Sequence, residues 1–285
     1  MTSTEKRNRL RAILKGDVCK SPATVWDALS ARVAEAAGFD CGILSGSVCS
    51  ATVLGAPDLA LQTLTEFADQ IRRITRASGL SVFADADQGY GNALNAMRTV
   101  EELEHAGLAG LAIEDLVMPA QFGRHREPEL NSVQEAVGKL EAALSARQDA
   151  SLVIAARTAA LRIEPIARVV ERTRAYAATG VDALFVTGLG KVDDLDAIRS
   201  AVDIPIMLGS APAIPRAEAQ ARGVRFRLQG HAVLAVCAKA MHDTYMHLKA
   251  DGDAEDLKSK MATAEEMARL MRVVDYQTWD DAYLN

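Results

Sequence analysis

Ser81–Gly91 reads SVFADADQGYG, a short apolar run that ends in two aspartates and a glycine-rich turn. If the run is a β-strand, its alternation places Asp85 and Asp87 on the same face. Two adjacent carboxylates repel each other unless a cation lies between them, and a hard divalent cation such as Mg²⁺ prefers oxygen ligands. The stretch therefore predicts a strand that brings carboxylates to a metal site. The alternative is that the two aspartates and the glycines form only a polar turn after the strand.

The rest of the chain repeats the order of apolar strand, loop and amphipathic helix. The expected strands are Thr24–Ala28, Cys41–Ser45, Ser81–Asp85, Gly110–Glu114, Leu152–Arg157, Ala183–Thr187, Pro205–Leu208 and Arg225–Gln229. The expected helices are Thr2–Lys15, Ser30–Ala37, Thr65–Ala77, Ala93–Ala106, Val133–Ala146, Pro165–Ala178, Lys191–Ala201, Pro215–Ala221 and His231–Lys249. Strands that alternate with helices run parallel, and eight such units predict an α/β protein with a closed (β/α)8 TIM barrel. An open doubly wound sheet is the alternative, but the nucleotide fingerprint expected after its first strand is missing.

Length and composition fit one globular domain. The chain has 285 residues, of which 49% are hydrophobic and 25% charged, which is ordinary for a barrel with a short N-terminal helix and a helical tail over Asp251–Asn285. A net charge of −6 with scattered basic residues argues against nucleic acid or an anionic membrane as partner. The four cysteines show no C-x-x-C spacing, and no signal segment is evident, so we expect reduced thiols in a cytoplasmic protein.

Polar residues collect where the strands end, which in a barrel is the edge that carries the active site. The expected ends are Ser45-Gly46-Ser47, Asp85-Ala86-Asp87, Glu114-Asp115, Arg157-Thr158 and Gly230-His231. Acidic groups beside an arginine and a histidine predict a metal site next to an anion site, where Arg157 can bind a carboxylate through two hydrogen bonds. Alternatively, Arg157 forms only a salt bridge with Glu114 or Asp115, and His231 merely starts a helix.

No nucleophile stands out among these strand ends. The chain has no G-x-S-x-G elbow, and Cys49 reads as a small buried residue rather than a reactive thiol. We therefore expect metal-assisted chemistry without a covalent intermediate.

The combined motifs resemble the isocitrate lyase/phosphoenolpyruvate mutase superfamily, and most of all its oxaloacetate decarboxylase branch. The matching segments are Trp26–Arg32, Ser45-Gly46-Ser47, Pro57-Asp58-Leu59, Asp85–Asn92, Ile113-Glu114-Asp115, Ala156-Arg157-Thr158 and Gly230-His231. The resemblance implies a barrel whose eighth helix is swapped between subunits, usually within a homotetramer. It also implies Mg²⁺ or Mn²⁺ at Asp85, with Asp58, Asp87 and Glu114 around it. Ser45, Gly46, Ser47, Arg157 and His231 match positions that bind an α-keto carboxylate.

Departures from the family pattern narrow the expected reaction. Phe122 stands where lyases of the superfamily carry a cysteine that acts as acid or base, and phenylalanine cannot transfer a proton. Ala159 replaces a polar residue found in many relatives, and Arg225 and Arg227 add two arginines to the last strand.

The leading hypothesis is Mg²⁺-dependent decarboxylation of oxaloacetate, or a similar β-keto acid, to pyruvate and CO2 through a metal-bound enolate. In it, Asp85, Arg157 and His231 are the catalytic residues. One alternative is a carbon–carbon lyase or hydrolase acting on a larger 2-keto or 2-hydroxy acid, with Asp115 or His125 as acid. Alternation along the last strand puts Arg225 and Arg227 on one face, and they would favour a substrate with an additional anionic group if that face points inward. The other alternative is a barrel that binds a metabolite without catalysis.

Overall fold

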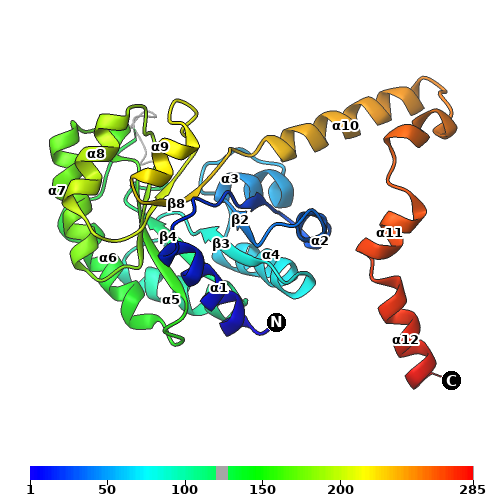
Figure 1. The fold of residues 1–285 in the computed structure, drawn as a ribbon, viewed down its shortest axis with the longest axis horizontal. Coiled ribbons are helices and arrows are strands. Elements are labelled where there is room, and N and C mark those ends of the chain that lie inside the picture. Colours follow the sequence, from blue (N-terminus) through cyan, green and yellow to red (C-terminus); the bar gives the residue numbers. More distant parts are fainter. Residues whose placement is uncertain (120–127, 285) are drawn as a thin grey trace. The chain divides into compact units, whose positions relative to one another are not determined.

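A computed structural model describes residues 1–119 and 128–284 and shows an α/β fold built on a curled parallel sheet (Figure 1). Eight strands lie in the sheet in chain order, each hydrogen-bonded to the next. The strands are β1 Ala23–Thr24, β2 Cys41–Leu44, β3 Ser81–Asp85, β4 Gly110–Glu114, β5 Val153–Thr158, β6 Ala183–Val186, β7 Ile206–Leu208 and β8 Val224–Arg227. Lys20 forms a parallel bridge with Phe226, so the segment just before β1 lies beside β8.

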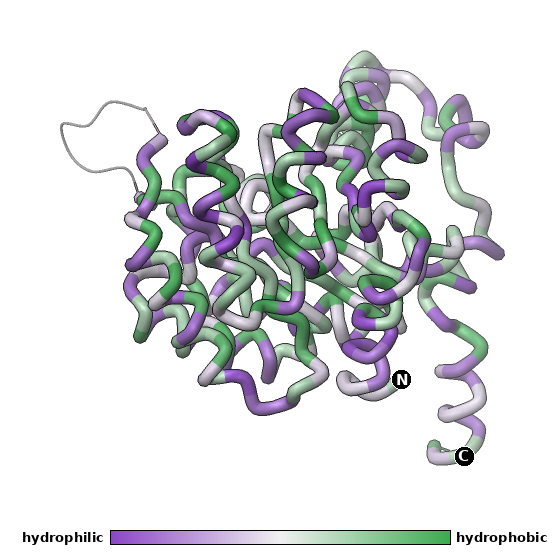
Figure 2. Tube along the Cα trace, turned by 60° about the vertical axis from the view of Figure 1, so that its left-hand side comes forward, coloured by the Kyte–Doolittle hydropathy of each residue, from purple (hydrophilic) through white to green (hydrophobic). Residues whose placement is uncertain are grey.

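Helices follow most strands and cover the outside of the sheet in the first part of the chain. They are α1 Ser3–Lys15, α2 Ala28–Ala36, α3 Gly46–Cys49, α4 Leu64–Ala77, α5 Ala93–His105, α6 Val133–Ala146, α7 Ile166–Ala178, α8 Val192–Ala201 and α9 Arg216–Ala221. A π-helical stretch, Ser50–Leu54, continues α3, and a 3₁₀ turn, Ala160–Arg162, follows β5. All residues of β2, β3, β4 and β6 are buried, whereas the helical turns carry both hydrophobic and hydrophilic residues (Figure 2).

The alternating order of strands and helices is confirmed, and one predicted strand is wrong over most of its length. Only Ala23–Thr24 pairs as β1, whereas Ala28 already begins a helix. Asp27 caps that helix, because its carboxylate accepts a hydrogen bond from the backbone N–H of Ser30 while the Ser30 hydroxyl bonds back. This local capping box ends the strand early.

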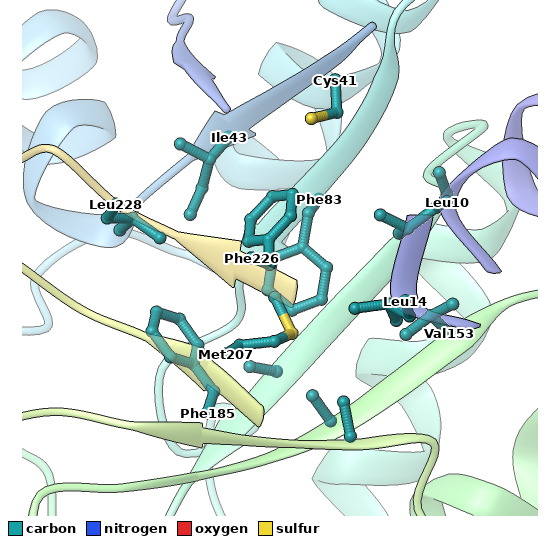
Figure 3. Close-up of a cluster of buried hydrophobic side chains, with 14 residues drawn as sticks. Leu10, Leu14, Cys41, Ile43, Phe83, Val153, Phe185, Met207, Phe226 and Leu228 are labelled. Carbon is teal, nitrogen blue, oxygen red and sulfur yellow. The ribbon is translucent and has the colours of Figure 1, made fainter. Parts of the chain in front are cut away.

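Side chains that point inward from the strands fill the centre of the sheet (Figure 3). The Phe83 ring lies 6.2 Å from that of Phe185 and 5.7 Å from that of Phe226, measured between centroids. Gly110 has no side chain at this point, and a Cβ there would lie 2.8 Å from both Leu10 Cδ2 and Val153 Cβ. The core is thus closely packed around a glycine.

Helix α1 packs against the end of the sheet where the strands begin. Its Leu10 and Leu14 enter the central cluster, beside Val153 in Figure 3. A polar residue of α1 also holds the helix in this place: Lys6 Nζ donates to the carbonyls of Thr75 and Ser78, each at 2.6 Å. The helix therefore supplies both apolar area and donors for carbonyls that end a neighbouring helix.

The second compact unit, His231–Asn285, is entirely helical apart from its connections. It contains α10 Ala232–Lys249, a 3₁₀ segment Ala254–Lys260, α11 Ala264–Leu270 and α12 Val273–Tyr283, and none of these has a buried residue. The Tyr276 and Trp279 rings meet at 5.1 Å within the unit. None of the helices in the described residues is long and apolar enough to cross a membrane.

Close packing around Gly110 predicts that Gly110→Ala lowers the free energy of unfolding by about 1–3 kcal/mol, because the added methyl group overpacks the core. Gly138→Ala is the matched control, since a Cβ there meets nothing within 4 Å and lies on helix α6. It should leave stability unchanged or raise it by up to about 1 kcal/mol. Urea unfolding of both variants measures the difference, and equal stability of Gly110→Ala and wild type would contradict the packing argument.

Candidate active site

Three adjacent strands bring a cluster of buried charges together. β3 ends at Asp85, β4 at Glu114, and Arg157 lies near the end of β5, directly opposite Glu114 in the pairing register. Arg157 Nη1 donates to Asp85 Oδ2 and lies 3.2 Å from Glu114 Oε2. The three side chains are 19%, 10% and 4% exposed for Arg157, Asp85 and Glu114. The guanidinium also lies 5.5 Å from the centroid of the Phe185 ring, which fixes its orientation.

The turn after β3 presents the second aspartate. Asp87 has a left-handed backbone, with φ of 46°. Its carboxylate lies against Gly46, where an added Cβ would be 2.5 Å from Asp87 Oδ1. Glycine at position 46 thus leaves space for this carboxylate in its present position, and the Ser45–Ser47 segment lies against the second aspartate.

Burial and mutual repulsion shape the protonation of these acids. Burial, with the charges of Asp85 and Asp58, raises the pKa of Asp87 to about 8, and Arg157 opposes this shift. Burial also raises the pKa of Glu114 to about 7, again against the effect of Arg157. One arginine therefore does not fully offset the buried negative charge, and a further cation near these carboxylates would be stabilised.

Several buried polar atoms of the cluster have no hydrogen-bond partner among the described residues. They are Asp85 Oδ1, Glu114 Oε1, Gln88 Oε1 and Arg157 Nε. Oxygen atoms of this kind suit Mg²⁺, which takes one or two carboxylates and keeps several waters. No three histidine, cysteine, aspartate or glutamate side chains within residues 1–119 and 128–284 form a ready metal-binding group. The unpaired oxygens of Asp85 and Glu114 fit a cation that keeps most of its water ligands.

Ser45–Ser47 begin the short helix after β2. The Ser45 hydroxyl accepts from the backbone N–H of Val48 at 3.3 Å and lies 3.0 Å from the Ser47 hydroxyl. The segment therefore carries a hydroxyl group on each side of Gly46, the residue that lies against the Asp87 carboxylate. Asp58, beyond the π-helical stretch, is exposed and acts on the site through its charge.

Asp115 is turned into a separate buried network. It accepts hydrogen bonds from the Thr158 hydroxyl at 2.6 Å, the Tyr176 hydroxyl at 2.9 Å and the backbone N–H of Ala159 at 3.3 Å. Its two oxygens are thus occupied by structural donors, and the network gives no support to Asp115 as the acid of a lyase. The small side chain of Ala159, 3% exposed, lies within this packing.

The other residues singled out from the sequence are not part of the described cluster of buried charges. His231 is the first residue of the second unit, directly before α10, and its role as a substrate anchor stays a prediction. The sequence left open which face of β8 carries Arg225 and Arg227. They lie on the opposite face from the core residue Phe226 and bond to backbone carbonyls, so they form no anion site on the inner face. Phe122 and His125 lie outside the described residues.

Cys49 is buried, as expected, and burial raises the pKa of its thiol to about 11. Its sulfur accepts a hydrogen bond from the Gln62 amide at 2.9 Å, so it has the surroundings of a packing residue. None of the four cysteines, all of them within the described residues, forms a disulfide.

Two neighbours of the site were not predicted from the sequence. Gln88 belongs to the quoted motif, yet its buried side chain was not singled out; its amide donates to the Met118 carbonyl at 3.0 Å. Lys139 was given no role from the sequence, but it is buried next to the Gln88 carbonyl. A lysine on an amphipathic helix carries no local signal of such burial.

Comparison with known proteins agrees with this arrangement. The family model described as phosphoenolpyruvate phosphomutase matches residues 10–249. The oxaloacetate decarboxylase of Bradyrhizobium diazoefficiens is 49% identical over 274 residues, which cover 95% of this chain and 94% of that protein.

Solved structures give the same result. The phosphoenolpyruvate phosphomutase of Streptomyces platensis subsp. rosaceus has a TM-score of 0.89 at 29% identity, over 98% of this chain and 99% of that one. A phosphonopyruvate hydrolase complex with oxalate and Mg²⁺ also has a TM-score of 0.89, at 25% identity and 100% coverage of both chains. The chain therefore belongs to the phosphoenolpyruvate mutase/isocitrate lyase superfamily, as its motifs predicted.

Proposed function

We propose that the protein decarboxylates oxaloacetate, or a similar β-keto acid, to pyruvate and CO2. The observation that carries the proposal is the near full-length similarity to oxaloacetate decarboxylases, at 49% identity for the Bradyrhizobium diazoefficiens protein. The buried group of Asp85, Glu114 and Arg157 supports it, because such a reaction needs charge stabilisation rather than a nucleophile.

Mg²⁺ or Mn²⁺ is the proposed cofactor. Asp85 and Glu114 would hold it through their unpaired oxygens, with Asp87 and Asp58 adding negative charge around it. When bound, the cation would supply Lewis acidity that polarises the 2-keto oxygen of the substrate.

The residues of the chain divide the remaining tasks. Arg157 offsets the buried acids and keeps one unpaired N–H group, on Nε, for an anionic ligand. The Ser45–Ser47 segment would orient the α-carboxylate through its hydroxyl and backbone N–H groups, and His231 would anchor the substrate from the start of α10. As the bond from C3 to the β-carboxylate breaks, its electron pair forms the enolate of pyruvate, and a proton taken up at C3 completes the reaction.

No observation in the described residues favours either alternative function, the lyase or hydrolase or the barrel that only binds a metabolite. A lyase would need an acid near the site, and the Asp115 carboxylate is already occupied by three donors. A barrel that only binds the metabolite predicts metal and oxalate binding without turnover, so the assay below separates it from the enzyme.

We also propose that the sheet closes as a (β/α)8 barrel and that the chain forms a homotetramer in which α10 covers a partner subunit. The bridge between Lys20 and Phe226 supports closure. The second unit supports assembly, because its apolar side chains are largely solvent-exposed, with 66% for Val236, 67% for Tyr245 and 72% for Val274. The free cysteines suit a reducing compartment, and we keep the cytoplasm as the proposed location.

The purified protein is expected to consume oxaloacetate in a Mg²⁺-dependent way, well above a blank with Mg²⁺ alone, and oxalate should inhibit it as a mimic of the enolate. Asp85→Asn should lower kcat/KM at least about 100-fold, because it removes a charge that holds the cation. Asp203→Asn, at a fully exposed carboxylate, is the control and should behave as wild type. Wild-type activity in Asp85→Asn would rule out this site, whereas oxalate binding without turnover would favour a binding protein.

Metal binding is expected to release about one proton near pH 7. Asp87 and Glu114, with pKa values raised to about 8 and about 7, hold protons at that pH in the metal-free protein, and the cation favours their charged forms. Apparent metal affinity should therefore rise with pH across this range, and the proton release should shrink above the raised pKa values. Calorimetry in two buffers of different ionisation enthalpy measures the release; heats that do not depend on the buffer would contradict it.

Light scattering after size exclusion should give about four times the chain mass of 30.5 kDa. Val236→Asp places a charge on an exposed apolar position of α10 and should shift the protein towards smaller species. Ser200→Asp, on the exposed surface of α8, is the control and should not. A wild-type protein that elutes as a monomer would refute the proposed assembly.

A further inference from the structure

We propose that Lys139 is a positioning residue that holds the turn carrying Asp87 against the end of β4, and so sets the affinity of the site for a divalent cation. The inference rests on the metal site of the proposed function and not on the identity of the substrate. Nothing in the motif pattern assigns a role to this lysine.

The surroundings of Lys139 are unusual for a lysine. Its side chain projects from α6 and the residue is only 4% exposed. Its Nζ lies 3.3 Å from the Gln88 carbonyl oxygen and 3.5 Å from Asn131 Oδ1. No carboxylate of the described residues lies within ion-pair distance of it. A buried ammonium group costs free energy unless its interactions offset that cost, so its contacts with two neutral oxygens require an explanation.

The first contact holds the turn after β3. Four successive carbonyls of this turn accept hydrogen bonds, one from within the turn and three from other parts of the chain. The donors are Gly89 N to Ala86 O at 3.0 Å, Glu114 N to Asp87 O at 2.7 Å, Lys139 Nζ to Gln88 O at 3.3 Å and Thr99 Oγ1 to Gly89 O at 3.1 Å. Lys139 is the one charged donor in this set. Asp87 has a left-handed backbone, a conformation that persists in a non-glycine residue only where surrounding contacts hold it. The hydrogen bonds to the turn provide such contacts and so keep the Asp87 carboxylate beside Gly46.

The second contact leads to a residue that is itself firmly held. Asn131 donates its backbone N–H to the Asp115 carbonyl at 2.8 Å and its side-chain amide to Glu135 at 3.0 Å. Its own carbonyl accepts from Arg172 at 3.0 Å. Lys139 thus connects the turn after β3 to an anchor at the end of β4.

Lys139 also lies directly behind the charged cluster. It lines a cavity of about 10 Å³ together with Glu114 and Arg157. A side chain in this place touches neither the open oxygens of Asp85 nor the Ser45–Ser47 segment. Its loss should therefore loosen the turn that carries Asp87, and weaken metal binding more than the chemical step at saturating metal.

The test uses the full chain, freed of metal, with Mn²⁺ alone as probe. Lys139→Met keeps the length of the side chain and removes the charge and the donors; Lys15→Met, at an exposed lysine that ends α1, is the matched control. Calorimetry should show Mn²⁺ affinity about 10–100-fold weaker in Lys139→Met, the usual cost of losing a group that supports metal ligands. Lys15→Met should bind as wild type.

Kinetics separate positioning from a general loss of structure. In Lys139→Met the metal concentration for half-maximal activity should rise by the same factor, whereas kcat at saturating metal stays within about twofold of wild type. Lys139→Gln keeps an amide N–H donor, so its Mn²⁺ affinity should lie between those of the wild type and Lys139→Met. It also serves as the test if Lys139→Met does not fold. Wild-type Mn²⁺ affinity in either folded variant would overturn the proposal.

The two proposals fail in different ways. If the wild type binds Mn²⁺ but does not consume oxaloacetate, the substrate assignment falls, while the comparison of Mn²⁺ affinities still decides the role of Lys139. If the wild type binds no Mn²⁺, both the metal site and the role of Lys139 are refuted.

Discussion

Arg157 bound to two buried carboxylates is the interaction on which the site depends. Burying Asp85 and Glu114 at neighbouring strand ends is unfavourable unless a cation accompanies them, and β5 supplies one in register. The compensation is incomplete, because the pKa values of Asp87 and Glu114 remain raised and one oxygen of each of two carboxylates is unpaired. The fold therefore stabilises the cluster enough to form and leaves it with affinity for a further positive charge.

Behind this cluster the polar groups are satisfied more fully. Asp115 is held by three donors, and each polar group of Asn131 has a partner. The contrast separates two kinds of buried polar residue. Some fix the strand ends in place through a full set of hydrogen bonds, and others keep unpaired polar atoms that could bind a ligand. A site of this design obtains its reactivity from unmet hydrogen-bonding capacity within a rigid surrounding.

The sequence predicted much of this arrangement, because strand order in a parallel sheet converts distant residues into neighbours. Asp85 and Arg157 are 72 positions apart, yet each lies at or next to the end of its strand, so the repeat predicted that they lie at the same edge of the sheet. The limit of the predicted first strand was wrong because the capping interaction of Asp27 is local and competes with strand pairing. The short helix after β2 and the burial of Lys139 were missed, since each depends on tertiary contacts that leave no periodic signal. For Arg225 and Arg227 the alternation gave a shared face but not its direction, which the packing of Phe226 decides.

Helix α1 has a consequence for the order in which the chain can fold during synthesis. It is made before the strands that it contacts, and some of them come much later: Leu10 and Leu14 belong to one cluster with Val153 and Leu228. Its Lys6 partners, the carbonyls of Thr75 and Ser78, are made earlier, but the apolar cluster stays incomplete until the later strands exist. The full docking of α1 therefore depends on contacts of high sequence separation and becomes one of the last events in completing the core.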